Sequence, residues 1–428
     1  MGEHIPAKIG KYSIRRKIGA GATSTVYLAD DPFFGREVAI KVVYRNILQD
    51  PVHGQRYRKL FLNESSLAGK LQHPHIATIY DAVMNSESHY LVMEYVPGGT
   101  LERYCDVDNL LAYGEVVEII FKCCRALEYA HRLGVIHRDI KPANIMLGEQ
   151  SDVKITDFGT ALSQFAEHTQ VSGVLGSPAY MSPEQVSEQP LTHQTDIYSL
   201  GVVMYQLLTG RLPFAADNQF SLLQKIVNEP PLPVARARPE VPVTLARVVE
   251  SAMEKKPQKR YKSWNEFSLD LTEAFARLEQ PKDRIADTRK FDALRKLEFF
   301  REFTDVELWE LLRISSWKHF PPNRALIAEG NLGQSFYILA SGKAEVVKGD
   351  KQLTRLSAGD CFGEMAFIKQ VPTPRIASVL SNTEVLLVKV RAEALLEASE
   401  NLQLRFNKRF LQILVDRLVT TTDMVSRA

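Results

Sequence analysis

The 428-residue sequence contains few cysteines, almost no net charge and no long apolar run. No stretch of about 18 uncharged apolar residues occurs, so we expect no transmembrane helix and no membrane partner. The first ten residues include Glu3 and Pro6 and lack an apolar core, which argues against a signal peptide. A formal charge of +2 gives no electrostatic reason to expect nucleic-acid binding.

The four cysteines show neither zinc-ligand spacing nor a Cys-x-x-Cys pair. Cys123 and Cys124 are adjacent on a predicted helix, and Cys105 and Cys361 stand alone. Buried free thiols are the simplest interpretation, and they are typical of a reduced, cytoplasmic compartment. The composition, 45% hydrophobic and 24% charged, otherwise provides enough apolar residues for two cores.

The periodicity of the apolar residues divides the chain near residue 290. Before this point, short β-like runs over 12–48 predict a small antiparallel sheet, and long helical patterns follow it. After it, short glycine-punctuated β-like runs over 317–390 predict an antiparallel barrel or sandwich between helical segments. We therefore predict an α+β protein with domains at 11–279 and 291–428. The polar segment 280–290 is interpreted as a linker, with a solvated continuation of a helix as the alternative.

Several charged and glycine-rich motifs follow one another in the first domain. Gly19-Ala20-Gly21 occupies the first predicted hairpin, and Lys41 ends an otherwise apolar Val-Ala-Ile-Lys strand. A lysine at such a position is costly unless it is paired, and Glu64 on the next helix is the available partner. His-Arg-Asp-Ile-Lys-Pro-Ala-Asn at 137–144, Asp-Phe-Gly at 157–159 and Ser-Pro-Glu at 182–184 come next. A single Gly-x-Gly is weak evidence because most such pairs are turns, but the ordered set is specific.

This ordered set resembles the protein kinase family across the first domain, and the resemblance implies a two-lobed fold that uses ATP and Mg²⁺. Asp139 would then accept the proton of the substrate hydroxyl, and Lys141 would neutralise charge on the transferred phosphoryl group. A lysine at position 141 resembles the serine/threonine kinases, so we expect protein substrates with serine or threonine. Lys41, paired with Glu64, would position the α- and β-phosphates. The implied magnesium ligands are Asn144 and Asp157, since Mg²⁺ prefers oxygen ligands.

The same resemblance implies a nucleotide pocket between the two lobes. Backbone groups of the strand-ending segment 94–96 would meet the adenine, and the glycine loop would cover the phosphates. The residues implied to line this pocket are Ile18, Gly19, Ala20, Gly21, Val26, Ala39, Lys41, Glu94, Val96 and Met146.

The sequence departs from the kinase pattern at three serines. Ser24 stands where many kinases have a third glycine, Ser177 replaces a threonine, and Ser182 replaces the alanine before Pro-Glu. None of these changes removes a charged group that the reaction needs. We therefore expect an active enzyme and not a non-catalytic nucleotide-binding scaffold. The run Tyr-Met-Ser-Pro-Glu-Gln at 180–185 resembles the bacterial branch of the family.

Two further kinase features concern regulation and stability. Arg138 precedes Asp139, and in such kinases this arginine helps to receive a phosphate from the activation loop. Thr169 and Ser172 lie in that loop and are candidate phosphorylation sites, although both are equally compatible with plain polar loop residues. Glu184 is expected to form a structural ion pair with Arg260.

The second domain carries a different set of motifs, at 336–346, 359–366 and 374–379. Together they resemble the cyclic nucleotide-binding domain family, which implies a jelly-roll-like β-barrel with flanking helices. Arg375 would bind the cyclic phosphate, and Glu364 would accept a hydrogen bond from the ribose 2′-OH. Backbone groups of Gly363, Ala366 and Ile376 would complete the anion site. An alternative is that Arg375 forms a structural ion pair with Glu364 in an empty fold. The gap between Glu364 and Arg375 is longer than expected for the family, and the segment 370–373 is either an accommodated bulge or a change in the pocket.

The C-terminal segment 417–422 resembles the last helix of the bacterial cyclic-AMP receptor proteins. There the hydroxyls at the positions of Thr421 and Thr422 meet adenine, and Ile376 provides no hydroxyl for guanine, so cyclic AMP is favoured. In that family the same helix forms a homodimer. A matching apolar stripe is present here, although packing on the domain's own barrel explains it equally well: Phe406, Phe410, Ile413, Leu414 and Leu418. We expect the second domain to regulate the kinase, and the alternative is that it only dimerises or docks substrates.

Overall fold

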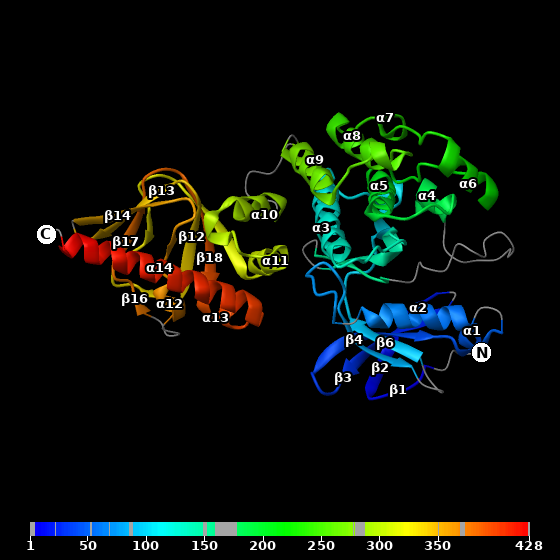
Figure 1. Ribbon diagram of the computed structural model, residues 1–428, viewed down its shortest axis with the longest axis horizontal. Coiled ribbons are helices and arrows are strands. Elements are labelled where there is room, and N and C mark those ends of the chain that lie inside the picture. Colours follow the sequence, from blue (N-terminus) through cyan, green and yellow to red (C-terminus); the bar gives the residue numbers. More distant parts are fainter. Residues whose placement is uncertain are drawn as a thin grey trace. The chain divides into compact units, whose positions relative to one another are not determined.

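The computed structural model of the chain describes residues 5–21, 23–51, 54–67, 69–84, 89–148, 152–158, 178–276, 278, 287–349, 351–368 and 373–426. Contacts divide the chain into two compact units, Met1–Gln280 and Pro281–Ala428 (Figure 1). Helix α10 (Asp287–Lys296) begins inside the range 280–290 interpreted as a linker, so the last part of that range is helical. Among the helices of the described ranges, none has the length and apolarity needed to cross a bilayer.

The first unit begins with a small lobe built on an antiparallel six-stranded sheet of order β1-β2-β3-β4-β6-β5. Side chains of β4 alternate between the two sheet faces, as extended backbone requires. Val38 and Ile40 enter a core on one face, whereas Ala39 packs with Phe61 of α2 on the other. The bounds are β1 Lys8–Ile9, β2 Tyr12–Ala20, β3 Ser24–Asp31, β4 Arg36–Val43, α1 Arg45–Gln49, α2 Gly54–Ser66, β5 Ile79–Met84 and β6 His89–Glu94.

The large lobe of the first unit is mainly helical. Helix α3 packs against α5 and α9, and α5 also packs against α8, around a core of fully buried aliphatic and aromatic side chains (Figure 1). The hairpin of β7 and β8 lies beside α3 and carries the residues that precede Asp157. The bounds are α3 Tyr113–Arg132, β7 Ile145–Leu147, β8 Val153–Ile155, α4 Pro183–Val186, α5 His193–Thr209, α6 Gln219–Asn228, α7 Val234–Ala237, α8 Val243–Ala252 and α9 Trp264–Ala276.

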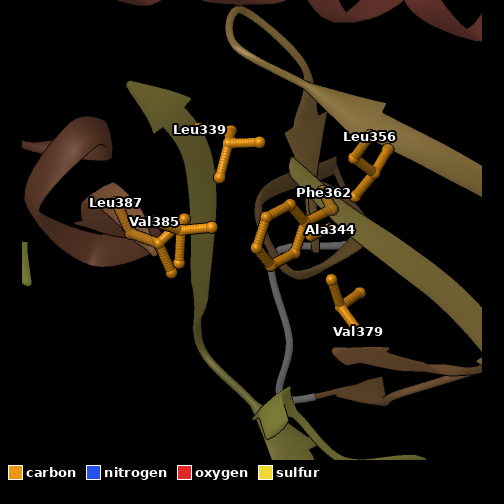
Figure 2. Packing of buried hydrophobic residues seen from close by; sticks show 7 residues of the cluster. All are labelled: Leu339, Ala344, Leu356, Phe362, Val379, Val385 and Leu387. Carbon is orange, nitrogen blue, oxygen red and sulfur yellow. The ribbon is translucent and has the colours of Figure 1, made fainter. Parts of the chain in front are cut away.

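The second unit pairs two antiparallel four-stranded sheets, of order β10-β17-β13-β14 and β15-β12-β18-β9. Their inner faces enclose an apolar core that includes Leu339, Phe362 and Val379 (Figure 2). This arrangement confirms the expected antiparallel barrel or sandwich between helices. The strands are β9 Ser315–Phe320, β10 Ala325–Ile327, β11 Leu332–Gly333, β12 Ser335–Ser341, β13 Lys343–Lys348, β14 Lys351–Ser357, β15 Cys361–Phe362, β16 Thr373–Pro374, β17 Ser378–Ser381 and β18 Val385–Arg391. The helices after α10 are α11 Asp305–Ile314, α12 Met365–Ile368, α13 Ala392–Leu396 and α14 Glu400–Ser426.

The apolar stripe of α14 is divided between two environments. Phe406 and Phe410 are buried, and their rings lie 5.4 and 5.1 Å from the ring of Phe336 on β12. These two residues therefore serve the core of their own unit. Leu418, in contrast, is 69% exposed. Four apolar residues of α14 outside the expected stripe are also exposed: Leu404, Leu411, Val415 and Val419.

Candidate functional site

The side chain of Lys41 lies between two carboxylates. Its Nζ is 2.7 Å from Oδ1 of Asp157 and 3.3 Å from Oε1 of Glu64. Lys41 shares a sheet face with Ala39, and Glu64 lies three residues beyond Phe61 on α2, so strand and helix periodicity bring the pair together. The expected Lys41–Glu64 contact is therefore present, with Asp157 as an additional partner.

The charges of this cluster depend on one another. Burial lowers the pKa of Lys41, but Asp157 and Glu64 outweigh it and raise this pKa above its ordinary value. Burial likewise pushes the pKa of Asp157 upward, but the Lys41 ammonium holds it below its ordinary value. Burial raises the pKa of Glu64 to about 7, against the attraction of the lysine. At neutral pH the ammonium and the Asp157 carboxylate are therefore both charged.

A second cluster surrounds Asp139 on the loop before β7. Oδ2 of Asp139 accepts hydrogen bonds from Nζ of Lys141 at 2.8 Å and from Nδ2 of Asn144 at 3.0 Å. Nδ2 of Asn144 also donates to the Asp139 carbonyl at 2.8 Å. Asn144 ends a short 3-10 turn, and this turn places the three predicted residues within contact of one another.

The two clusters are joined through Thr156, the residue before Asp157. Its backbone N–H donates to the Asn144 carbonyl at 2.9 Å, and its carbonyl lies 2.9 Å from Nε2 of His137. The ring of Phe158 also lies 4.6 Å from the ring of His137. Asp139, Asn144, Lys41 and Asp157 therefore belong to one continuous site.

The backbone of the site is held in a rarely populated conformation. Arg138 has a φ of 69° and Asp157 a φ of 61°, values that cost non-glycine residues about 1–3 kcal/mol each. The carboxylate of Asp196 on α5 accepts the backbone N–H groups of His137 and Arg138, both at 2.8 Å. Burial raises the pKa of Asp196 against these donors. Asp196 was not expected from the motifs, and its only signal was an acid among apolar residues of a predicted helix.

Within the described residues, neither backbone conformation nor close packing explains the two glycines of the loop. Gly19 and Gly21 both avoid positive φ, and a Cβ on either residue would meet no described atom closer than 3.8 Å. Backbone that is free of side chains here suits the close approach of a ligand. Next to the loop, Ile18 and Val26 pack on the cluster that contains Ala39, which gives the pocket an apolar wall.

The strand that ends at Glu94 leads to the expected adenine-contacting segment. The Glu94 backbone N–H donates to the Thr78 carbonyl at 2.8 Å, and Val96 is buried. Met146 on β7 pairs with Thr100, just beyond this segment. Val96 therefore lies in the segment that follows β6, and Met146 faces the chain just beyond that segment.

In the second unit, Arg375 is enclosed by backbone. Its guanidinium donates to the carbonyls of Gly363 at 3.0 Å and Ser335 at 2.6 Å. A Cβ on Gly333 or Gly363 would lie 2.1 or 2.6 Å from guanidinium atoms, so both glycines are needed for this close approach. These bonds use two of the five N–H donors of the arginine.

Glu364 does not pair with Arg375 in the structure, so the suggested Arg375–Glu364 ion pair is wrong. Its Oε1 lies 2.6 Å from the guanidinium of Arg417 on α14, and this arginine also donates to the Cys361 carbonyl at 2.7 Å. The last helix is therefore tied directly to the segment that carries Gly363 and Glu364. Arg417 stood in the C-terminal motif, but the sequence did not reveal this partner.

Some of the expected residues cannot be placed. Thr169, Ser172 and Ser177 lie outside the described residues, and so do the side chains of Ala366, Thr421 and Thr422. Ile376 is described and is 62% exposed.

Comparison with known sequences agrees with this geometry in the first unit. The family described as the protein kinase domain matches residues 12–268, well over half of the chain. The chain belongs to the protein kinase family. The cyclic nucleotide-binding domain family matches residues 317–401, so the kinase domain is followed by a domain of that family. The family resemblances of both units are confirmed.

The kinase domain is similar to those of curated bacterial serine/threonine-protein kinases. It is 38% identical over 268 residues to PrkC of Bacillus subtilis and to PknB of Mycolicibacterium smegmatis. It is 35% identical over 263 residues to a probable serine/threonine-protein kinase of Clostridium acetobutylicum. The matches cover 61 to 62% of this chain and 39 to 42% of those relatives. The bacterial character expected from the Tyr-Met-Ser-Pro-Glu-Gln run is therefore supported.

Proposed function

We propose that the chain is a serine/threonine protein kinase that transfers the γ-phosphoryl group of MgATP to a protein hydroxyl. One observation carries this proposal: Lys41, Asp139 and Asp157 lie in one continuous site. Family membership and the names of the bacterial relatives support the same reaction. Most of the barrier reduction in phosphoryl transfer comes from positioning and charge neutralisation, and these are the roles that such residues can perform.

Each charged side chain has a distinct role in this proposal. Asp139 orients the substrate hydroxyl and accepts its proton, while Lys141, bonded to the same carboxylate, neutralises charge on the moving phosphoryl group. Lys41 holds the α- and β-phosphates, and the carboxylate of Glu64 keeps the Lys41 ammonium on the pocket side of the sheet. Lys41 therefore exchanges part of its contact with Asp157 for phosphate oxygens when ATP binds.

The residues present also fit a magnesium ion. Asn144 and Asp157 are oxygen donors of the kind that Mg²⁺ prefers, and the described bonds of the Asn144 side chain use only its nitrogen. Bound Mg²⁺ would neutralise the phosphates of ATP. Asn144 and Asp157 are held in place by the hydrogen bonds of Thr156 and by the ion pair with Lys41.

Incubation of the purified full chain with γ-labelled ATP, Mg²⁺ and a generic protein substrate tests the reaction. We expect label on phosphoserine or phosphothreonine, no label after chelation of Mg²⁺, and a loss of about 100-fold in Lys41→Met. The methionine keeps the apolar stem but removes the ammonium that Asp157 and Glu64 hold. An unlabelled substrate with the wild-type chain, or full activity in Lys41→Met, would contradict the proposal.

We further propose that the second domain binds a cyclic nucleotide, preferably cyclic AMP, and thereby regulates the kinase. Support comes from the family match and from Arg375, whose remaining N–H donors suit a cyclic phosphate. The Arg417–Glu364 ion pair supplies a physical link, since a ribose hydroxyl on Glu364 competes with the arginine of α14. A ligand regulates only if its affinity differs between two states of the protein.

Thermal unfolding and phosphorylation rates with cyclic AMP and cyclic GMP test this regulation. At about 100 times its Kd, a ligand should stabilise the second domain by about 2.7 kcal/mol. Arg375→Leu should remove that response, whereas Arg355→Leu, an exposed arginine on β14, should retain it. Should both nucleotides leave the unfolding temperature and the rate unchanged, the alternative that this domain only dimerises or docks substrates would be favoured.

A further inference from the structure

A buried lysine of the large lobe pairs with a carboxylate at the end of the small-lobe sheet. Lys154 lies on β8 and is 6% exposed, and its Nζ is 2.8 Å from Oε1 and 3.0 Å from Oε2 of Glu94. Glu94 is the last residue of β6, where the chain leaves the small lobe. The contact therefore joins the two lobes within the first unit, and both carboxylate oxygens of Glu94 contact the Lys154 ammonium.

Glu94 is fixed by more than this ion pair. Its Oε2 accepts the backbone N–H of Thr78 at 3.2 Å, and its own N–H donates to the Thr78 carbonyl at 2.8 Å. The segment before Thr78 is in turn paired with β8: the Ala77 N–H donates to Ile155 and the Ile155 N–H donates to His75, both at 2.9 Å. Three segments thus meet at one point: the end of β6, the segment 75–78 and β8.

Both sides of this junction carry residues of the proposed ATP site. Glu94 begins the segment whose backbone is proposed to meet adenine. Lys154 stands opposite Met146 in the β7–β8 hairpin and three residues before Asp157 on the same chain segment. A shift of β8 relative to β6 would therefore move the adenine contacts and the proposed magnesium ligand apart.

Stability alone is a poor explanation for such a pair. Removing the Lys154 ammonium and most of the Glu94 carboxylate from water is costly, and well-packed apolar residues of similar size often stabilise a fold as well or better. A buried pair does, however, fix the distance between the two segments that it joins. A pocket divided between two lobes requires its residues to be held at fixed distances from one another.

We propose that Lys154 is a positioning residue for ATP: its ion pair with Glu94 keeps the adenine-contacting segment in register with Asp157. The inference rests on the proposed kinase function, and it adds a residue that the sequence motifs did not indicate. Lys154 acts through Glu94 and the backbone, without touching the nucleotide. Its loss should therefore weaken ATP binding equally in the ground state and the transition state.

The test compares Lys154→Met, Glu94→Gln and the double variant in steady-state phosphorylation of a generic protein substrate. In Lys154→Met we expect KM for ATP to rise about tenfold while kcat stays within about twofold, because uniform binding is lost. The double variant should be no worse than Lys154→Met, since the two changes remove the same interaction. Arg132→Met is the matched control, because Arg132 forms an exposed ion pair with Glu128 on α3 of the same lobe.

The outcomes separate this inference from the kinase proposal. If the wild-type chain transfers no phosphate, the kinase proposal fails first. If the wild type is active but KM for ATP is unchanged in Lys154→Met, the positioning role is refuted and the kinase proposal stands. A purely structural role would reduce the unfolding temperature and kcat per mole of protein, with an unchanged KM in the fraction that remains folded.

Discussion

Asp139→Asn should reduce the phosphorylation rate by about 1,000-fold, the scale of a positioned general base, and leave MgATP binding within about twofold. Asparagine has nearly the same shape as aspartate, and its carbonyl oxygen can still accept the hydrogen bond from Lys141. What it lacks is the negative charge and the basic oxygen that takes the substrate proton. Because Lys41 and Asp157 lie in the neighbouring cluster, the nucleotide contacts should survive the change.

Two measurements on the same preparation make this result decisive. Titration with a fluorescent ATP analogue reports MgATP binding, and incorporation of label into a protein substrate reports the chemical step. Asp217→Asn is a suitable control because this aspartate is exposed on the large lobe and takes part in none of the described contacts of the site. A variant that keeps more than about a tenth of the wild-type rate would exclude Asp139 as the base. A variant that also loses nucleotide binding would instead assign Asp139 a role in holding the pocket together.

The sequence predicted the parts of the kinase site that lie in short motifs. Lys41 and Glu64 were paired correctly because strand and helix periodicities fix which faces meet, and the Glu184–Arg260 pair is also confirmed. Asp196 was missed because its partners are backbone N–H groups 58 and 59 residues away. No local pattern encodes such a contact, since it depends on how α5 packs beside the loop at 137–139.

The second unit shows the same limit for long side chains. The sequence indicated that Arg375, Glu364 and the C-terminal motif belong together, but not which arginine takes the carboxylate. The structure pairs Glu364 with Arg417, because α14 runs beside the segment that carries Glu364. The periodicity of α14 also identified apolar residues without identifying their partner, and Phe406 and Phe410 pack on β12 of the same unit. An amphipathic pattern indicates that one face of a helix is buried. Only the tertiary structure identifies the element that covers this face.

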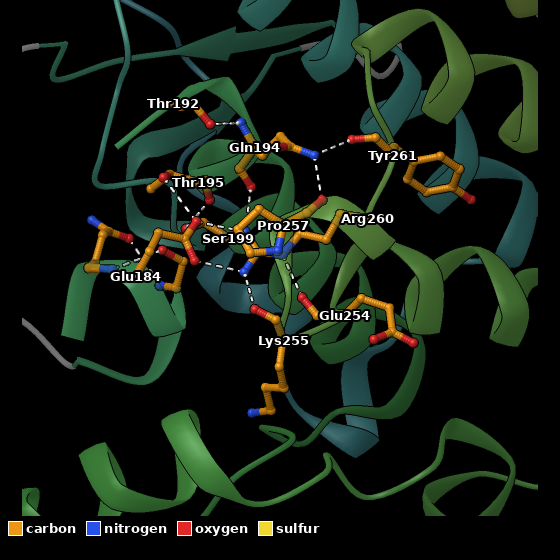
Figure 3. Close-up of polar contacts among 12 residues, drawn as sticks. Glu184, Thr192, Gln194, Thr195, Ser199, Glu254, Lys255, Pro257, Arg260 and Tyr261 are labelled. Atoms are coloured by element: carbon orange, nitrogen blue, oxygen red, sulfur yellow. Dashed lines mark hydrogen bonds and ion pairs between the residues drawn. The ribbon is translucent and has the colours of Figure 1, made fainter. Parts of the chain in front are cut away.

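All five N–H donors of the Arg260 guanidinium have an acceptor in the kinase domain. It donates to both oxygens of Glu184, at 2.6 and 2.7 Å, and its side chain is fully buried (Figure 3). Its other three N–H groups reach backbone carbonyls of Gln194, Glu254 and Lys255 at 3.0, 2.5 and 2.9 Å. One side chain thereby joins α4, the start of α5 and the segment that follows α8.

Arg260→Met should destabilise the kinase domain by about 3–5 kcal/mol, the cost of breaking a buried ion pair from one side. Burial alone raises the pKa of Glu184, and the arginine is what holds this pKa below its ordinary value. In the variant the carboxylate keeps the Thr195 hydroxyl at 3.1 Å as a donor but has no counter-charge. Three carbonyls also lose a donor, and methionine cannot replace any of them.

Urea unfolding, monitored by the loss of MgATP binding, measures this effect, because the proposed ATP site lies in the kinase domain and not in the second unit. Arg132→Met removes an arginine from an exposed ion pair and should change the free energy of unfolding by no more than about 0.5 kcal/mol. Arg260→Lys should recover only part of the loss, since an ammonium cannot reach both carboxylate oxygens and three carbonyls in one plane. An Arg260→Met domain as stable as the Arg132→Met control would show that α4 and α5 are held by apolar packing alone, and that the Glu184 carboxylate is relieved by protonation.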